Sequence, residues 1–311
     1  MKEIYAGGGY YGIGKIIKEY AIFPDFLPLP VSIQHGWANI THVHDACSGS
    51  PENWFWTESI AIKYQNEFKG LNIRVVGAPF LYLLTHLNYV EPIEKEGSIV
   101  FPAHSSKLIK VECDFDKYAD MLEELSDEYK PITICMYYLD IERGLDIPFR
   151  RKGFEIIKNG DSLYDVNFLK QFINNTHGKK YAFSNQTTSA LLFASVMGLV
   201  SFFYGPKVTL DSSDPDDNSL DYSEDIRNWE QQWLRSFRFP DYNIQNQREF
   251  TCNELGGSFL LSPKEMNKIL YKSAFSAKYF YSLLRRVVKD FLTAYIPSIY
   301  QQYTRYRDRN L

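Results

Sequence analysis

The sequence predicts an α/β protein built on parallel sheets. Between residues 31 and 206, short apolar runs of strand length alternate with segments that have helical periodicity. Strands separated by helices of this length form βαβ units, in which the strands are parallel. After residue 206 the apolar runs give way to helical patterns. We therefore expect an α/β body followed by a helical carboxy-terminal extension.

Eight strands are predicted in order along the chain. They are Val31–His35, Trp54–Trp56, Arg74–Gly77, Ile99–Pro102, Ile132–Tyr138, Phe154–Lys158, Tyr181–Ser184 and Leu199–Phe203. Helices are predicted over Phe115–Glu128, Asp165–Thr176, Thr188–Met197, Tyr222–Phe237, Pro263–Tyr271, Phe275–Ala294 and Pro297–Arg307. Several strands end in Gly, Pro, Ser or His. Because ligands bind beyond the carboxyl ends of parallel strands, these ends are where we look for a site.

The predicted domain boundaries follow changes in composition. The polar stretch Val90–Gly97 separates two groups of strands and is interpreted as a hinge, so one lobe covers residues 1–95 and a second covers 96–210. The remainder, 211–311, begins with an acidic loop at Asp211–Asp225. That loop contains Asp214-Pro215-Asp216, which we interpret as a solvated segment and not as a metal–nucleotide site.

Charge and composition exclude several classes of protein. A formal net charge of −4 disfavours nucleic acid as a partner. The four cysteines show neither a C-x-x-C pair nor zinc spacing, as expected for free thiols in a reducing compartment. No apolar run of about 18 residues is present, and glycines between Gly7 and Gly14 interrupt any signal-peptide pattern. We expect a cytoplasmic protein.

His35 is the first candidate site residue. It lies in Gln34-His35-Gly36-Trp37, directly after the strand residues Val31–Ile33. A histidine at a strand end can reach a cleft, and a pKa near neutrality suits a general base that removes a proton from a hydroxyl. The structural alternative is a half-buried histidine hydrogen-bonded to the backbone.

Two turns have the composition of anion sites. One is Phe101–Ser106, where small residues leave backbone N–H groups accessible and His104, Ser105 and Ser106 add donors. The other is Ser184–Ser189, at a predicted strand-to-helix turn, where hydroxyls and a helix amino terminus converge. Its candidate ligand-binding residues are Ser184, Asn185, Thr187, Thr188 and Ser189. Helix capping alone is the alternative for this second turn.

Acidic residues follow another predicted strand. Asp140 and Glu142 lie in the stretch Tyr138–Gly144, and Asn159-Gly160-Asp161 comes after the next strand. Carboxylates beyond a strand end can hold a ribose diol or a sugar hydroxyl. They can equally cap the helix that follows.

These segments together resemble the donor-binding half of bacterial polysaccharide-assembly glycosyltransferases with the GT-B fold. The matching runs, between Ser98 and Pro206, are F-P-A-H-S-S, I-C-M-Y-Y-L-D-I-E-R-G-L, G-F-E-I-I-K-N-G-D, S-N-Q-T-T-S and G-L-V-S-F-F-Y-G-P. Near the amino terminus, I-Q-H-G-W and V-V-G-A-P-F are similar to the H-G and G-x-P patterns of teichoic-acid polymerases. The arrangement of His before Ser/Thr is also similar to that of sialyl- and Kdo-transferases, which use CMP donors.

The resemblance implies two Rossmann-like lobes and a metal-independent glycosyltransferase of capsule or lipopolysaccharide biosynthesis. Residues 1–95 would then bind the acceptor, a glycan or lipid-linked glycan, and residues 96–210 the nucleotide-sugar donor, which is a substrate and not a cofactor. His35 is implied as the catalytic base, and Ser184–Ser189 with His104–Ser106 as the donor-phosphate site. The acceptor-side residues expected from this assignment are Gly9, Tyr10, Trp37, His42 and His44.

Two other functions remain open at this point. His42-x-His44-Asp45 could bind zinc in a hydrolase, although no further histidine follows soon after. A catalytically inactive sugar- or nucleotide-binding partner is the second. Gly7–Gly12 matches G-x-G-x-x-G but lacks the strand and the acid that a dinucleotide fold requires, so we interpret it as an acceptor-side glycine loop.

The carboxy-terminal stretch Phe275–Arg309 interleaves aromatic and aliphatic residues with Lys and Arg. Such a helix can lie on an anionic membrane surface. We expect its apolar face to pack on the first lobe and its basic rim to be free for peripheral contact with the cytoplasmic face of a membrane.

Overall fold

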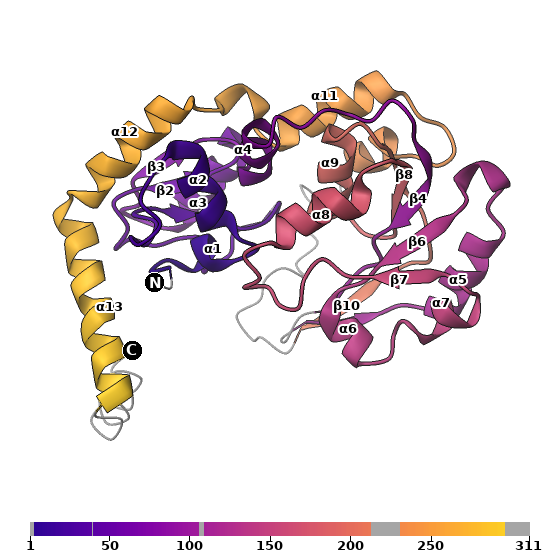
Figure 1. Cartoon of the computed structure of the whole chain (residues 1–311), viewed down its shortest axis with the longest axis horizontal. Helices are drawn as coiled ribbons and strands as arrows, with labels where there is room; N and C mark the ends of the chain where they lie inside the picture. The colour runs from indigo at the N-terminus through magenta and orange to yellow at the C-terminus, as the bar shows by residue number, and fades with distance from the viewer. Residues whose placement is uncertain (1–2, 39, 106–108, 213–230, 296–311) are drawn as a thin grey trace.

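Two separate parallel sheets and the helices around them make up the chain (Figure 1). The computed structural model describes residues 3–38, 40–105, 109–212 and 231–295. The expected α/β class with parallel sheets is confirmed. Ser106, Asp214-Pro215-Asp216, the acidic loop beyond Ser212 and the helix predicted at Pro297–Arg307 lie outside the described residues.

The first sheet has the order β1-β2-β3, all parallel. Its strands are short: β1 is Ser32–Ile33, β2 is Asn53–Phe55 and β3 is Ile73–Val75. Around it lie α1 (Ala6–Gly9), α2 (Ile13–Ala21), α3 (Glu58–Glu67) and α4 (Pro79–His86). Thr57 caps α3 through its side chain, and Pro79 begins α4, a position where a missing N–H costs nothing.

The second sheet has the order β7-β6-β4-β8-β9 and is also entirely parallel. Its strands are β4 (Glu96–Val100), β6 (Ile132–Cys135), β7 (Glu155–Ile157), β8 (Lys179–Ser184) and β9 (Val200–Phe203). Its helices are α5 (Phe115–Glu123), α6 (Tyr138–Glu142), α7 (Ile147–Arg151), α8 (Phe168–Thr176) and α9 (Ser189–Val196). All five strands overlap a predicted one.

One antiparallel pair, β5 (Ile109–Glu112) with β10 (Thr209–Ser212), was not expected. Both strands are four residues long and partly polar, so the sequence offers too short a pattern to distinguish them from loops. Val111 of β5 donates its N–H to the hydroxyl of Ser105 at 3.2 Å, which ties the pair to the loop after β4.

Aromatic packing joins the helices of the two sheets. Phe80 of α4 stacks on Phe193 of α9 with ring centroids 4.2 Å apart, and Phe172 of α8 packs edge-on against both. All three side chains are buried in one continuous hydrophobic core that also contains Trp54 from the first sheet and Phe101 from the loop after β4. The two sheets are therefore held in a fixed relation by side chains and not by the connecting chain alone.

The connection from α4 to β4 contains the stretch predicted as a hinge. Its ends are tied to the α9–β9 turn, because Tyr89 donates a hydrogen bond to the carbonyl of Met197 (3.2 Å) and Lys95 donates to that of Gly198 (2.7 Å). The predicted boundary at residue 96 coincides with the start of β4. Its role as a hinge stays a prediction.

The carboxy-terminal part is helical wherever it is described. Residues 231–236 are helical, followed by α11 (Ile244–Glu254), α12 (Pro263–Ala274) and α13 (Ala277–Tyr295). In Figure 1 these helices run back over both sheets, with α11 near α9 and α12 near α2, and α13 then extends away from the body. The expectation that the apolar face of this last helix packs on the first lobe is wrong, since its described apolar residues are mostly exposed.

Candidate functional site

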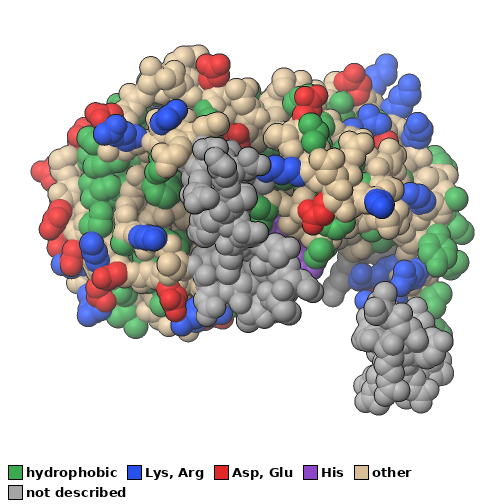
Figure 2. Space-filling view, turned by 180° about the vertical axis from the view of Figure 1, so that it is seen from behind, with side chains coloured by type: hydrophobic (Ala, Val, Ile, Leu, Met, Phe, Trp, Pro, Cys, Tyr) green, Lys and Arg blue, Asp and Glu red, His purple; other side chains and the backbone are tan. Residues whose placement is uncertain are grey.

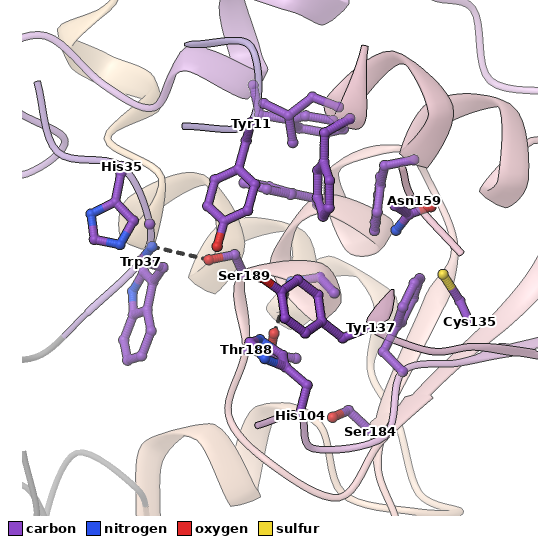
Figure 3. Close-up of a pocket in the computed structure, with 18 of the residues that line it drawn as sticks. Tyr11, His35, Trp37, His104, Cys135, Tyr137, Asn159, Ser184, Thr188 and Ser189 are labelled. Atoms are coloured by element: carbon purple, nitrogen blue, oxygen red, sulfur yellow. Dashed lines mark hydrogen bonds between the residues drawn. The ribbon is translucent and has the colours of Figure 1, made fainter. Parts of the chain in front are cut away.

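A cavity of about 340 Å³ lies between the two parallel sheets, at the carboxyl ends of their strands. The loops after β1, β4, β6, β7 and β8 all contribute to its wall, as expected for ligand sites in parallel sheets. Its polar lining groups are Tyr11, His35, His104, Tyr137, Tyr138, Asn159, Ser184, Gln186, Thr187, Thr188 and Ser189, several of which are labelled in Figure 3.

The inner wall of the cavity is aromatic. Trp56, Phe80, Phe101, Phe172 and Phe193 line it, and all five side chains belong to the shared core. Such a wall suits the face of a planar or sugar ring. Cys135 also lines this wall, and burial raises the pKa of its thiol to about 12, so it stays protonated at neutral pH and is no nucleophile.

His35 reaches the cavity from the loop after β1, and Asp45 fixes its orientation. The ring Nδ1 lies 2.7 Å from Asp45 Oδ1, and the His35 backbone N–H donates to the same oxygen at 3.1 Å. Tyr64 of α3 donates from its hydroxyl to the other carboxylate oxygen at 3.2 Å. With Nδ1 bonded to the carboxylate, the Nε2 atom is the one left to act on a ligand, and it has no partner among the described residues.

The charge state of His35 follows from this arrangement. Burial by itself would lower the pKa of the imidazole, but the negative charge of Asp45 and the hydrogen bond to it outweigh burial. The net effect raises the pKa above its ordinary value of 6.5. A base with a pKa closer to 7 is better matched to proton transfer at neutral pH.

This effect can be measured directly. In an NMR titration of the imidazole carbon-bound proton, we expect His35 to titrate above pH 6.5 in the wild type. In Asp45→Asn the charge is gone while the side-chain shape is kept, so the midpoint should fall below the wild-type value. A wild-type midpoint below 6.5 would show that burial prevails over Asp45.

The turn between β8 and α9 forms the opposite wall. Thr188 caps α9, its hydroxyl accepting from the Ala190 N–H at 3.3 Å. Ser189 accepts a hydrogen bond from the backbone N–H of Trp37 at 3.0 Å, drawn as a dashed line in Figure 3. The backbone N–H groups of Thr187 and Thr188 donate to no acceptor within the described part of the chain. His35 and the Ser/Thr-rich turn, far apart in sequence, thus lie at one cavity.

Two of the predicted residues of this turn have other partners. Asn185 does not line the cavity: its Oδ1 accepts from the Ala103 N–H at 2.9 Å and its Nδ2 donates to the Pro206 carbonyl at 3.2 Å. Ser184 lines the cavity, but its hydroxyl is hydrogen-bonded to the backbone of Gln186. These side chains hold the turn in shape.

In the turn after β4, too, one predicted residue lines the cavity and another holds the turn in place. His104 is exposed, lines the cavity and lies with its ring 4.9 Å from that of Tyr137. Ser105 is buried, and its backbone N–H donates to Asp140 Oδ2 at 3.0 Å. Asp140 therefore holds this turn and does not line the cavity, and Glu142 is exposed outside it.

Of the five expected acceptor-side residues, Trp37 alone lines the cavity. Trp37 lines the cavity, with its Nε1 donating to Glu254 of α11 at 2.7 Å. Tyr10 packs edge-on against His35 with centroids 5.1 Å apart, and the His42 ring lies 6.1 Å from that of His35, yet neither lines the cavity. Gly9 and the exposed His44 lie outside it as well.

The motif considered for zinc binding is arranged differently from a metal site. Asp45 is engaged by His35 and Tyr64, and the side chain of His44 is exposed. In the described ranges no group of three His, Cys, Asp or Glu side chains is placed to share an ion. The zinc hydrolase stays an untested alternative.

The glycine-rich segment Gly7–Gly12 has a packing role. A Cβ at Gly7 would overlap the carbonyl oxygen of Ile33 at the end of β1, and Gly12, with φ +77°, approaches the Val166 carbonyl too closely for any side chain. Tyr11, the residue before Gly12, donates from its N–H to the carbonyl of Leu163 at 2.7 Å and lines the cavity. The segment thus spans the space between the first sheet and the loop before α8.

Sequence reasoning missed the partners of His35. In the sequence, Asp45 stands out only as part of the motif with His42 and His44, and Tyr64 carries no signal of a site. The separation of ten residues between His35 and Asp45 carries no recognisable signal, because the intervening loop must fold back before the two can meet.

Comparison of the chain with protein-family models, with curated proteins and with solved structures finds no match. The likeness to GT-B glycosyltransferases therefore stays a prediction from the motifs. Among the described helices none is long and apolar enough to cross a membrane.

Proposed function

We propose that the protein transfers a sugar from a nucleotide-activated donor to a surface-glycan acceptor without a metal ion. One observation carries the proposal: a single cavity is lined by His35, which Asp45 holds from behind, after the first sheet, and by the amino terminus of α9 after a strand of the second. The hydrogen bond from Trp37 to Ser189 joins these two walls. A base and an anion-binding turn across one cavity are what a direct glycosyl transfer requires.

The α9 side would bind the donor. The N–H groups of Thr187 and Thr188, which meet no acceptor among the described residues, and the positive end of the helix dipole favour a phosphate there. When the bond between the anomeric carbon and the phosphate oxygen breaks, these groups stabilise the charge that develops on the leaving nucleotide. His104, on the loop after β4, lines the same cavity and can add a hydrogen bond.

The His35 side would bind the acceptor. Its Nε2 atom takes the proton of the acceptor hydroxyl while the hydroxyl oxygen attacks the anomeric carbon. Asp45 stabilises the imidazolium that forms, and Tyr64 in turn orients Asp45. A single displacement of this kind inverts the configuration of the sugar.

The finer fold assignment belongs to the same proposal. The two parallel sheets would correspond to the acceptor and donor lobes of a GT-B enzyme, with their carboxyl ends toward a common cavity. The aromatic wall supplies a surface on which a base or sugar ring can stack. An acceptor from capsule or lipopolysaccharide assembly fits the motif likeness.

A thermal-shift screen of the purified protein tests the binding half of this proposal. We expect one nucleotide among CMP, CDP, UDP, GDP and TDP to raise the melting temperature, because a ligand that binds only the native state stabilises it by mass action. At about 100 times its Kd the gain is about 2.7 kcal/mol, which corresponds to a rise of a few degrees. NAD and zinc complete the panel.

A pair of glycine variants provides the control. A Cβ at Gly36, which lines the cavity, would meet no atom within 4 Å, so Gly36→Leu should fill cavity space and abolish the shift without loss of stability. Gly49 lies outside the cavity with similar room, so Gly49→Leu should keep the shift.

No shift with any nucleotide, together with stabilisation by zinc that His42→Ala removes, would favour the hydrolase. Nucleotide binding without any transfer would favour the inactive binding partner.

A further inference from the structure

Helix α13 turns its apolar face away from the body of the protein. Its exposed apolar residues recur every three or four positions and form one stripe: Phe280, Tyr281, Leu284, Val287, Val288 and Phe291. Each is between 48% and 68% exposed. In a globular protein such a stripe normally faces the core.

The opposite side of α13 holds the helix to the body. Tyr279 is 3% exposed and donates from its hydroxyl to the Pro28 carbonyl at 2.8 Å. Lys278 donates to the Ser48 carbonyl at 3.1 Å. After these first turns the helix extends beyond the body (Figure 1). These contacts fix the orientation of α13 so that its apolar stripe faces outward.

Basic residues accompany the stripe along one flank. Arg285 and Lys289 are four residues apart, which places them on one side of the helix. The helix has four basic residues and one acid, Asp290, which pairs with Arg286 at 3.0 Å. In Figure 2, blue side chains lie beside green ones at the edge of the molecule next to the grey carboxy-terminal segment. This local positive charge stands in a chain whose net charge is −4.

We propose that α13 binds the protein to an anionic lipid surface, lying in the interface with its apolar stripe among the acyl chains. The charge favours lipid over a second copy of the chain. Two copies of α13 face to face would bring their basic flanks together, whereas anionic headgroups attract them. Apolar and aromatic residues on one face with Lys and Arg beside them are typical of interfacial helices. The inference does not depend on the proposed transferase activity.

Vesicle flotation with the full-length protein tests it. We expect the wild type to float with vesicles of phosphatidylcholine and phosphatidylglycerol. With vesicles of phosphatidylcholine alone, it should remain at the bottom of the gradient. Salt at about 1 M, where the Debye length is roughly 3 Å, should weaken binding. The double variant Leu284→Asp/Val288→Asp should bind about tenfold or more weakly, since it places two charges in the apolar stripe.

Matched variants separate a lipid contact from a general effect. Ile62 is 56% exposed on α3, so Ile62→Asp changes a comparable side chain elsewhere and should bind like the wild type. Arg285→Glu should weaken binding, while Lys117→Glu on the exposed face of α5 should not. Circular dichroism and melting temperature check that each variant is folded.

Two results would overturn the proposal. One is equal flotation of the wild type and Leu284→Asp/Val288→Asp. The other is a wild type that binds no vesicle but forms a dimer in light scattering, with the dimer lost in the same double variant. That second outcome would assign the stripe to a second copy of the chain.

Discussion

Replacing His35 with Gln is expected to lower the turnover number by about 10²–10⁴-fold, the range that a positioned general base contributes. Glutamine can still donate a hydrogen bond to Asp45, so the loop after β1 should keep its shape. It cannot accept a proton at neutral pH. Because the donor is proposed to bind at the α9 side, the thermal shift with the nucleotide should remain.

The measurement is the rate of glycosyl transfer with the donor nucleotide identified by thermal shift. His86→Gln, on the exposed end of α4, is the matched control and should be as active as the wild type. If His35→Gln retained full turnover, His35 would not be the base. If it lost nucleotide binding as well, its role would be in holding the cavity together.

The pH dependence of the same reaction has a defined sign. The base acts in its neutral form, so the rate should fall as the pH drops through the pKa of His35, which lies above 6.5. In Asp45→Asn the pKa of His35 falls, so this acidic limb should move to lower pH even as the maximal rate decreases. An acidic limb that stays in place in Asp45→Asn would belong to another group.

Gly7→Ala is expected to destabilise the fold by about 1–3 kcal/mol, the usual cost of forcing an extra group into a well-packed site. The added Cβ would overlap the carbonyl oxygen of Ile33, and this neighbour is backbone that cannot rotate away. Either α1 or β1 must move. Since Ile33 precedes His35 by two residues, activity should fall together with stability.

The adjacent glycine gives the control for this effect. A Cβ at Gly8 would meet Leu29 and Glu3 side chains at 3.5–3.8 Å, which is ordinary contact, and alanine is the better helix former. Gly8→Ala should therefore be neutral or slightly stabilising. The midpoint of urea unfolding measures both variants. Equal midpoints for the two would mean that α1 is not closely packed on β1.

Much of the fold is readable from the sequence because βαβ units leave a strong pattern. The strands around Ile99, Ile134 and Phe183 are buried apolar runs, and helices of ordinary length lie between them. His35 and Ser189 line the same cavity, and each follows the carboxyl end of a parallel strand, as the sequence predicts. The strands β1 and β8 belong to different sheets, so the strand pattern alone does not show how the two sheets meet.

The sequence does not predict which residues of the polar turns line the cavity and which hold the backbone in place. Ser189 and Asn185 come from one run of small polar residues, yet one meets the cavity wall and the other bonds to two backbone segments. Composition cannot separate these uses, because both require the same hydrogen-bonding groups. For α13, the sequence shows an amphipathic pattern but not the contacts of Tyr279 and Lys278, which decide the side that faces out.

The aromatic stack between α4 and α9 constrains how such a protein can evolve. Phe80 and Phe193 are encoded far apart but fill one space, so a change in the size of either ring must be matched by the other or by Phe172. Gene recombination that joined the first half of this chain to the second half of a diverged relative would bring mismatched rings together. We therefore expect such a chimera to be less stable than either parent protein.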